Sequence, residues 1–206
     1  NRIETYGLSG SFLFHTLADQ DWLSFGKVRV NYAEAPIFPG TYQTSPTYGS
    51  GTAYGSLASL NVPNTLANPN LTGGMRTELE YGFEMKFLKN RLGIDFTYFD
   101  REDSNLPVAI TAAGGTGYTG LNVNSKITST AGVEAMISGT PIVTDDLRWD
   151  VSVNFGRFKK TVDFIYEGIE RNILDSWLSW SSMDLQEIVG QEWGMLYGRK
   201  RLKDAA

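Results

Sequence analysis

Three acidic side chains at alternating positions are the first residues whose types and spacing suggest chemistry. Glu78, Glu80 and Glu84 share one face of a segment in which apolar residues occupy the positions between them. Side chains two positions apart on a strand stand roughly 7 Å from one another, which suits either paired acid–base catalysis or a hydrated wall of ion pairs. We favour the wall, because basic residues able to neutralise the carboxylates lie nearby in the pattern. These residues are Lys27, Arg29 and Lys86.

The single histidine and a glycine-rich motif offer little catalytic potential. The chain has one His and no Cys, so any triad or multi-histidine metal site would have to use His15, and no G-x-S-x-G elbow accompanies it. Gly115–Gly120 spells G-x-G-x-x-G. It lacks the helix start that a dinucleotide pyrophosphate requires. We expect a turn histidine and a glycine-rich surface loop.

Acidic residues near position 100 are candidate metal ligands. Asp100, Glu102 and Asp103 cluster where we expect a loop to begin, and their oxygens could bind Ca²⁺. The 12-residue calcium-loop pattern with its glycine is missing. We therefore predict no metal and no cofactor, and no catalytic residue is assigned, so the chain is not expected to be an enzyme.

Composition narrows the class of protein further. Eighteen basic against 23 acidic residues give a net charge of −5, which argues against a partner bound through a phosphate backbone. Mean hydropathy is −0.23, and no apolar stretch is long enough for a transmembrane helix. A transmembrane β-barrel escapes this test, because only alternate residues face lipid. The many aromatic and glycine residues suit β-structure with numerous turns.

The clearest structural signal lies between Thr77 and Phe87. Five apolar residues alternate without a break against glutamate, glycine and lysine, which separates them onto opposite faces of a strand. The polar connection Leu88–Arg91 follows, and a second alternating segment runs from Leu92 to Tyr98. The two segments predict one β-hairpin.

The same alternation recurs along the chain and predicts about six strands. The further segments are Tyr6–Phe14, Lys27–Ala33, Val133–Ser138 and Leu147–Phe155. Short connections at Leu88–Arg91 and Pro141–Asp146 alternate with long polar ones at Ala35–Arg76 and Arg101–Thr130. Residues Asp163–Trp180 break the pattern, since isoleucines recur at every fourth position, and we predict a short helix within a long loop there.

Two architectures explain the alternation. In a water-soluble β-sandwich the apolar face would pack inside, whereas in a membrane barrel it would face lipid and the charged face would line a wet interior. The bulk of the apolar face and the alternation of short and long loops favour the barrel. Tyr32, Tyr81, Tyr98 and Trp149 would then be available for the interfacial aromatic girdles.

Several segments resemble SusC/RagA-type TonB-dependent outer-membrane receptors. Asp21–Ala33 is similar to the family's "fLk-lK-lRaSYg" strand. Asn68–Thr72, Glu78–Glu84 and Asn90–Phe99 resemble its "NPnLkpE-t-syEiGl…nnRl-ld-tyY" block, although Gly73-Gly74-Met75 replaces Lys-Pro-Glu. Further similar segments, in the family's order, are Gly139–Ile142, Leu147–Phe155 and Val189–Gly198.

This resemblance implies a fold and a function. Residues 1–206 would form part of an all-β, antiparallel transmembrane barrel of roughly 22 strands with long extracellular loops, from its later half, with the plug domain, the TonB box and the remaining strands absent. Such receptors import bulky nutrients across the outer membrane of Gram-negative cells. The cargo would be a glycan oligosaccharide or a peptide, the partners a SusD-like surface lipoprotein and TonB, and the surroundings membrane lipid.

Aromatic side chains outside the strands are the candidate ligand contacts. Flat rings suit stacking on sugars, packing against a capping lipoprotein, or packing within the loop itself. The candidates are Tyr118, Trp177, Trp180, Trp193 and Tyr197. Two other functions remain open: a siderophore or vitamin receptor of the same barrel type, and a secreted carbohydrate-binding β-sandwich.

Overall fold

The computed structural model describes residues 3–17, 20–178 and 183–198, and these residues are dominated by β-strands. The chain folds as two compact units. The first unit comprises residues 1–35, 76–102 and 129–160, and the second comprises residues 36–75, 103–128 and 161–206. Within the described ranges the helical elements are two three-residue 3₁₀ turns, η1 and η2, at Phe14–Thr16 and Gly114–Thr116.

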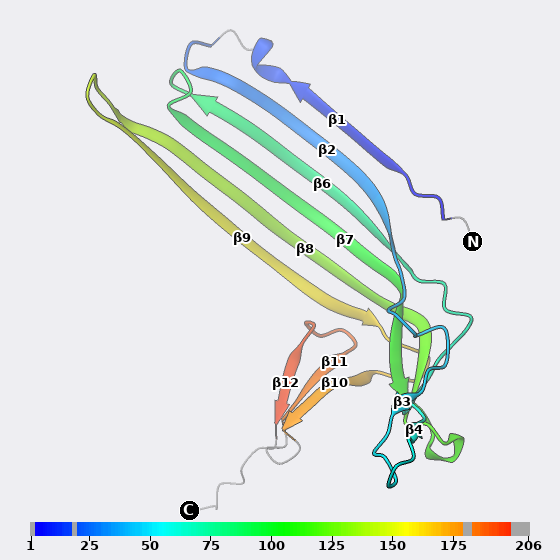
Figure 1. Cartoon of the computed structure of the whole chain (residues 1–206). Coiled ribbons are helices and arrows are strands. Elements are labelled where there is room, and N and C mark those ends of the chain that lie inside the picture. The colour runs from blue at the N-terminus through cyan, green and yellow to red at the C-terminus, as the bar shows by residue number, and fades with distance from the viewer. Residues whose placement is uncertain (1–2, 18–19, 179–182, 199–206) are drawn as a thin grey trace, which may run out of the picture. The chain divides into compact units, whose positions relative to one another are not determined.

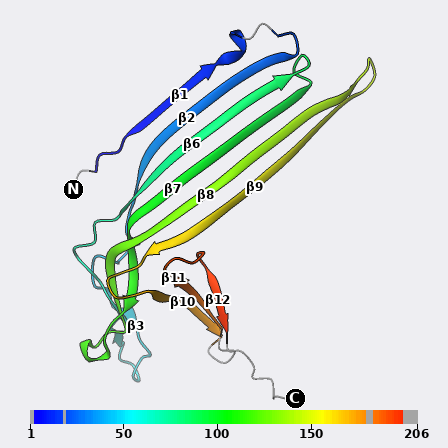
Figure 2. The same ribbon diagram turned by 180° about the vertical axis from the view of Figure 1, so that it is seen from behind.

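Six long strands supply the sheet of the first unit, and several continue into the second. They are β1 (Gly7–Leu13), β2 (Leu23–Ile37), β6 (Gly74–Phe87), β7 (Leu92–Thr111), β8 (Gly120–Val143) and β9 (Arg148–Phe164). The strand order is β1-β2-β6-β7-β8, and β9 pairs with β8 (Figures 1 and 2). The expected antiparallel sheet of about six strands is confirmed.

The pleat explains why these sequences form strands. In the β1–β2 ladder, Phe12 stands opposite Val28 and Leu8 opposite Tyr32, while Ser11 stands opposite Arg29. Directly opposed residues of an antiparallel pair project from the same face. The ladder therefore collects apolar residues on one face and polar residues on the other.

Tight turns join β6 to β7 and β8 to β9. Leu88, Lys89 and Asn90 adopt positive φ angles of 53°, 56° and 66°, and the Leu88 amide donates to the Trp22 carbonyl at 3.1 Å. The β8–β9 turn closes when the Thr144 amide donates to the Leu147 carbonyl at 2.8 Å. Strand β8 therefore extends to Val143, beyond the predicted start of this connection at Pro141.

The second unit holds the shorter elements. Strand β3 (Gly49–Ser50) pairs with β4 (Leu60–Asn61), and β10 (Arg171–Leu178), β11 (Met183–Ile188) and β12 (Met195–Gly198) form a three-stranded sheet. Strand β5 (Thr65–Leu66) runs parallel to the start of β8 and joins Thr65 to Gly120 in register.

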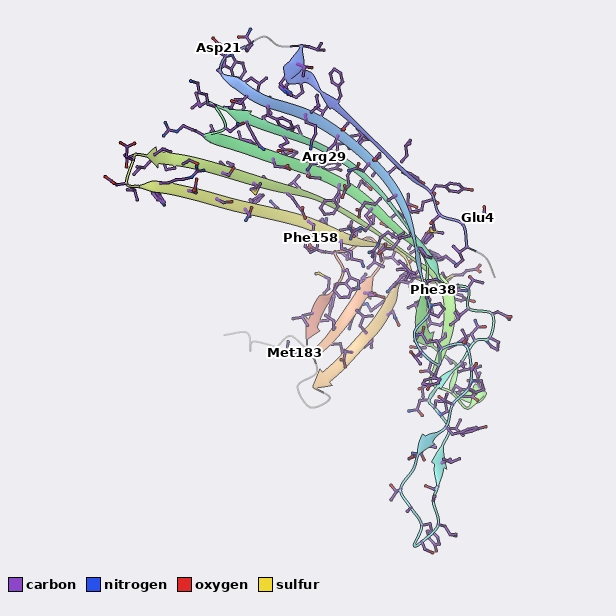
Figure 3. The ribbon with its side chains drawn as sticks, turned by 45° about the horizontal axis from the view of Figure 1, so that its top comes forward. Glu4, Asp21, Arg29, Phe38, Phe158 and Met183 are labelled. Carbon is purple, nitrogen blue, oxygen red and sulfur yellow. The ribbon has the colours of Figure 1, made fainter. Side chains whose placement is uncertain are left out.

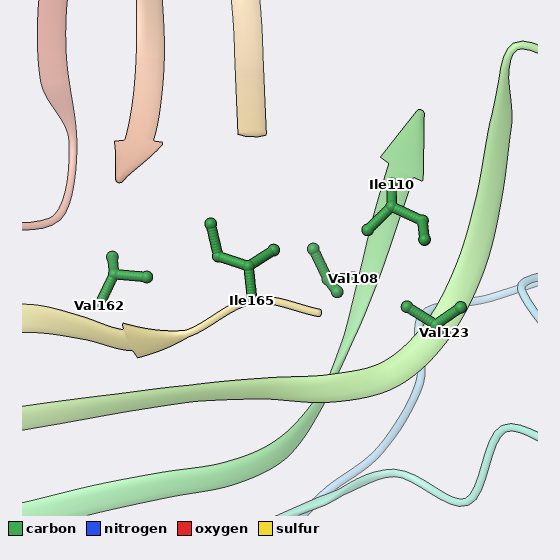
Figure 4. Packing of buried hydrophobic residues seen from close by; sticks show 5 residues of the cluster. All are labelled: Val108, Ile110, Val123, Val162 and Ile165. Atoms are coloured by element: carbon green, nitrogen blue, oxygen red, sulfur yellow. The ribbon is translucent and has the colours of Figure 1, made fainter. Parts of the chain in front are cut away.

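A small hydrophobic core lies in the second unit (Figure 4). It combines side chains from β7, β8, the end of β9 and the residue that follows it. The members are Val108, Ile110, Val123, Val162 and Ile165. Val162 and Ile165 are fully buried. This core fixes the ends of three strands that contribute residues to both units.

Two sequence predictions are corrected here. The long loop expected over Arg101–Thr130 is mostly strand, because β7 continues to Thr111 and β8 begins at Gly120. The helix expected within Asp163–Trp180 is instead strand β10, preceded by a tight turn in which Tyr166 bridges Ile169. Residues four apart share a face on a strand as well as on a helix, so their spacing did not distinguish the two.

No helix in the described part of the chain is long and apolar enough to cross a lipid bilayer.

The buried core predicts a specific stability effect. We expect Ile165→Ala to lower the free energy of unfolding by about 2–5 kcal/mol, through lost burial and a residual cavity. Chemical denaturation of the purified receptor in detergent measures this. Ile173→Ala, at an exposed position of β10, is the matched control and should change stability by no more than about 0.5 kcal/mol. Equal effects of the two substitutions would contradict the assignment of the core.

Candidate functional site

The charged face of the first unit is the principal candidate site. Figure 3 shows side chains standing on both faces of its strands, with Arg29 in the middle of β2. On β2 the charged face carries Lys27, Arg29 and Asn31, and on β6 it carries Glu78, Glu80 and Glu84. Salt bridges and hydrogen bonds link these residues across the strands.

The glutamates of β6 are paired rather than poised for catalysis. Glu84 binds Lys27 at 3.0 Å and Lys86 at 3.2 Å. Glu78 pairs with Arg101 of β7, and Glu80 accepts a hydrogen bond from Asn31 at 3.2 Å. The predicted ion pairs with Lys27 and Lys86 are confirmed for Glu84, whereas Glu78 pairs with Arg101 and Glu80 is bound by a neutral amide.

The Arg29 side chain extends across a neighbouring strand on this face. Its guanidinium crosses β6 and donates two hydrogen bonds to the Asp95 carboxylate on β7, at 2.8 and 3.2 Å. A third donor reaches the Thr97 hydroxyl. The crossing is possible because β6 carries Gly82 there: a Cβ at that position would stand 2.7 Å from the Arg29 Cζ. Bidentate pairing of this kind is strong and geometrically specific.

A hollow of about 500 Å³ lies beside this pair. It spans the charged face from β2 to β9, where Gly156 leaves open space above the strand. Its polar lining includes Arg29, Asp95, Thr97, Glu134 and Asn154. Because Asp95 neutralises Arg29, the exposed Glu134 leaves the hollow with a net negative charge.

The opposite face of the same strands is apolar and uncovered. Tyr81 is 47% exposed and Val153 is 61% exposed, in the middle of β6 and β9. Of the hydrophobic residues that are buried in the described structure, only Leu23 belongs to the first unit. The apolar face therefore does not form a protein core within this chain, as a soluble sandwich would require.

The predicted aromatic contacts are placed as follows. Tyr118 is half-buried in the β7–β8 connection. The Trp193 indole donates to a Glu187 carboxylate oxygen at 2.9 Å, and the Arg171 guanidinium lies 5.1 Å from the centre of the Tyr197 ring. Trp177 lies in β10, but its side chain is outside the described set, and Trp180 is outside the described residues altogether. Their role as ligand contacts stays a prediction.

The second unit contains a buried ion pair that the sequence pattern did not predict. The Lys126 ammonium donates to Glu187 at 2.8 Å, and Glu187 is fully buried. Its second carboxylate oxygen has no hydrogen-bond partner in the described structure. The two residues are 61 positions apart, and neither sits in a regular alternating pattern that could have linked them. Separating such a buried pair is strongly destabilising.

The remaining chemical candidates are ordinary structural residues. The His15 Nδ1 lies 3.2 Å from the Gly26 carbonyl, at the 3₁₀ turn after β1. The G-x-G-x-x-G segment forms a turn that leads directly into β8. Asp100, Glu102 and Asp103 lie within β7 and not at a loop entrance. The described residues include no group of three or more side chains that could hold a metal ion.

A comparison with known protein families finds one family that matches this chain. The model of the TonB dependent receptor-like β-barrel matches residues 6–206. The chain belongs to this TonB-dependent receptor family. The family comprises transporters and receptors and is not one of enzymes. No curated protein matches the chain.

Solved structures of a peptide transporter share the fold of this chain. A chain of the RagAB peptide transporter is similar with a TM-score of 0.75, at 17% identity over 90% of this chain. The RagAB peptide importer in its open-open and closed-closed states gives TM-scores of 0.72 and 0.74, also at 17% identity, over 90% and 91% of this chain. The present chain spans 20% of the length of those chains.

The passage of the Arg29 side chain over Gly82 leads to a testable prediction. We expect Gly82→Ala to destabilise the receptor by about 1–3 kcal/mol, because the added methyl group displaces a charged hydrogen-bond network. Alanine would otherwise stabilise a strand by about 0.5–1 kcal/mol relative to glycine. Denaturant unfolding of Gly82→Ala, Asp95→Ala and the double variant forms the thermodynamic cycle.

This thermodynamic cycle has a matched control variant and an outcome that would contradict the prediction. Gly156→Ala lies on the same face, where an added Cβ has no neighbour within 4 Å, and it should be neutral or slightly stabilising. The double variant should cost little more than either single one, because both remove the same interaction. Additive losses would show that Gly82 and Asp95 act independently.

Proposed function

We propose that this chain is part of the wall of an outer-membrane receptor that imports a bulky nutrient with energy supplied through TonB. The observation that carries the proposal is the two-faced sheet of the first unit. Its apolar face is exposed and its other face carries paired charges, as a strand between lipid and a wet lumen requires. The family match over residues 6–206 supports the same conclusion.

The other strands needed to close the barrel would belong to the rest of a longer receptor. Strands at an open edge leave backbone groups unpaired, and such groups are too costly in hydrocarbon. The chain's coverage of only 20% of the RagAB chains supports a larger closed barrel. We propose a Gram-negative outer membrane as its location.

The cargo and partners follow from the resemblance to SusC/RagA-type receptors. We propose an oligosaccharide or a peptide as cargo, captured with a SusD-like surface lipoprotein, with TonB acting through a plug domain. The name of the RagAB peptide transporter supports the peptide alternative. Trp193 and Tyr197 are proposed contacts for the cargo or the lipoprotein. A siderophore or vitamin receptor is the competing transport function.

Substitution on the two faces of β9 tests the membrane assignment. Val153→Lys should destabilise the folded receptor by about 2–4 kcal/mol if its side chain lies near the middle of the bilayer. Ser152→Lys, the adjacent residue on the charged face, should be tolerated. Quantifying folded receptor in the outer-membrane fraction measures both. Equal tolerance of the two lysines would refute a lipid-facing assignment of Val153.

An uptake experiment tests the import function. Cells carrying the complete receptor should accumulate labelled oligosaccharide or peptide, and deleting TonB should abolish accumulation, as should deleting the proposed lipoprotein. A parallel arm with an iron-loaded siderophore should show no receptor-dependent uptake. If the receptor took up only the iron-loaded siderophore, we would assign it the competing transport function in place of nutrient import. Uptake that does not depend on TonB would contradict the proposal.

A further inference from the structure

Two basic residues continue the apolar row of strand β9. The sequence pattern indicated a strand only as far as Phe155, whereas β9 continues to Phe164 in the structure. Side chains leave a strand on alternate faces, so every second residue from Trp149 onwards belongs to one row. The row reads Trp149, Val151, Val153, Phe155, Arg157 and Lys159. It therefore changes from apolar to cationic within a single two-residue step.

Contacts at Gly132 of β8 show that the alternation holds this far along β9. A Cβ added at Gly132 would stand 2.6 Å from the Phe99 ring of β7 and 2.7 Å from the Cβ of Phe158, which is labelled in Figure 3. Phe99 is in phase with Asp95, so all three residues belong to the charged face. The residues on either side of Phe158 are the two basic ones, and they project from the apolar face.

Strand β7, in the same unit, becomes charged at the same level. After Tyr98, its row on the apolar face continues with Asp100 and Glu102, and both carboxylates are exposed. Because Phe99 and Phe158 flank the same glycine, β7 and β9 reach the same level there. Each row turns charged within a few residues of that level. The boundary between apolar and charged residues is therefore a property of the sheet and not of one strand.

The length of the apolar part of β9 matches the hydrocarbon layer of a bilayer. Positions 149 to 157, counted inclusively, are nine residues, and a transmembrane strand needs about 9–11. Trp149 lies close to the tight β8–β9 turn, where an indole ring suits one interface of the bilayer. In the proposed barrel Arg157 then lies at the other interface. This is the outer one, because short turns close the inner end of such barrels and long connections leave the outer end.

Neither cation is neutralised by the part of the chain that the structure describes. Arg148, at the other end of β9, binds Asp150 at 2.9 Å. Arg157 and Lys159 are exposed and make no salt bridge to any described residue. Two positions apart on one row, the two side chains start roughly 7 Å from each other. Both charges are therefore available to an anion at the membrane surface.

The residue types and their surroundings select the anion. A guanidinium group matches the oxygens of a phosphate with two parallel hydrogen bonds, and an ammonium group adds a compact positive charge. Phosphate groups are the anions that lipids carry at the level where acyl chains end, and each basic residue near such a surface adds to the attraction. Asp100 and Glu102 would repel a phosphate from β7, which confines it to the side of β9.

We propose that Arg157 and Lys159 bind a phosphate group of the phosphorylated glycolipid in the outer leaflet of the outer membrane. This inference rests on the proposed outer-membrane location and adds a lipid site to it. Arg157 would hold two oxygens of the phosphate, while Lys159 would bind a third oxygen or a second phosphate of the same lipid. The apolar residues that precede them on the row would contact its acyl chains.

Lipid binding by the complete receptor, purified in detergent, tests this inference. The probes are lipid A with two phosphate groups, lipid A without phosphate, and phosphatidylglycerol, and native mass spectrometry counts the lipids bound. We expect the phosphorylated lipid A to bind at least tenfold more tightly than the other two. Arg157→Gln and Lys159→Gln should each weaken its binding about fivefold, and together about 25-fold. Lys89→Gln, an exposed residue in the turn at the opposite end of the sheet, is the matched control and should have no effect.

The outcomes separate this inference from the proposed function. Equal binding of the three lipids, or glutamine variants that bind lipid A like the parent, would each overturn the lipid site. The comparison of lipids uses the unaltered receptor, so it decides the matter even where a variant fails to fold. Outer-membrane location and TonB-dependent uptake are measured in parallel on the same receptor. A receptor that shows neither would refute the import function, whereas both together with a failed lipid result would refute only the site.

Discussion

The pleat of the β-strand is the constraint on which this structure depends. Successive side chains must leave a strand on opposite faces, so one sequence of residues can satisfy two different surroundings at once. In β6 and β9 this places Tyr81 and Val153 on one side and glutamates, serine and asparagine on the other. A membrane wall with a wet interior is the environment in which both faces are satisfied without a second protein layer.

The charged face adds lateral links that backbone hydrogen bonding alone does not provide. The Lys27–Glu84 pair joins neighbouring strands, whereas Arg29 bonds to Asp95 on the second strand along. Forming such pairs costs little desolvation free energy, because their charged groups remain partly exposed to solvent. The Lys126–Glu187 pair differs in being buried, so it depends far more on both partners being present.

The sequence predicted the strands in which polar and apolar residues alternate without a break, and it missed strand segments in which that alternation is interrupted. From Leu79 to Phe87 every second residue is apolar, which matches the two-residue period of a strand, so β6 was predicted almost to its ends. The extension of β7 was missed because Asn105, with a positive φ angle, and Pro107 interrupt a run that otherwise alternates. The Arg29–Asp95 pair depends on how three strands align, and residue types within one strand do not encode that alignment.

Gly82 has a consequence for how related receptors can differ. Because its missing side chain leaves room for the Arg29 guanidinium, the residues at positions 29, 82 and 95 depend on one another structurally. A lineage that acquired a larger residue at position 82 would gain from a shorter side chain at position 29, and the carboxylate at position 95 would then lose its partner. Coevolution among relatives should therefore join these three positions, although they lie on three separate strands.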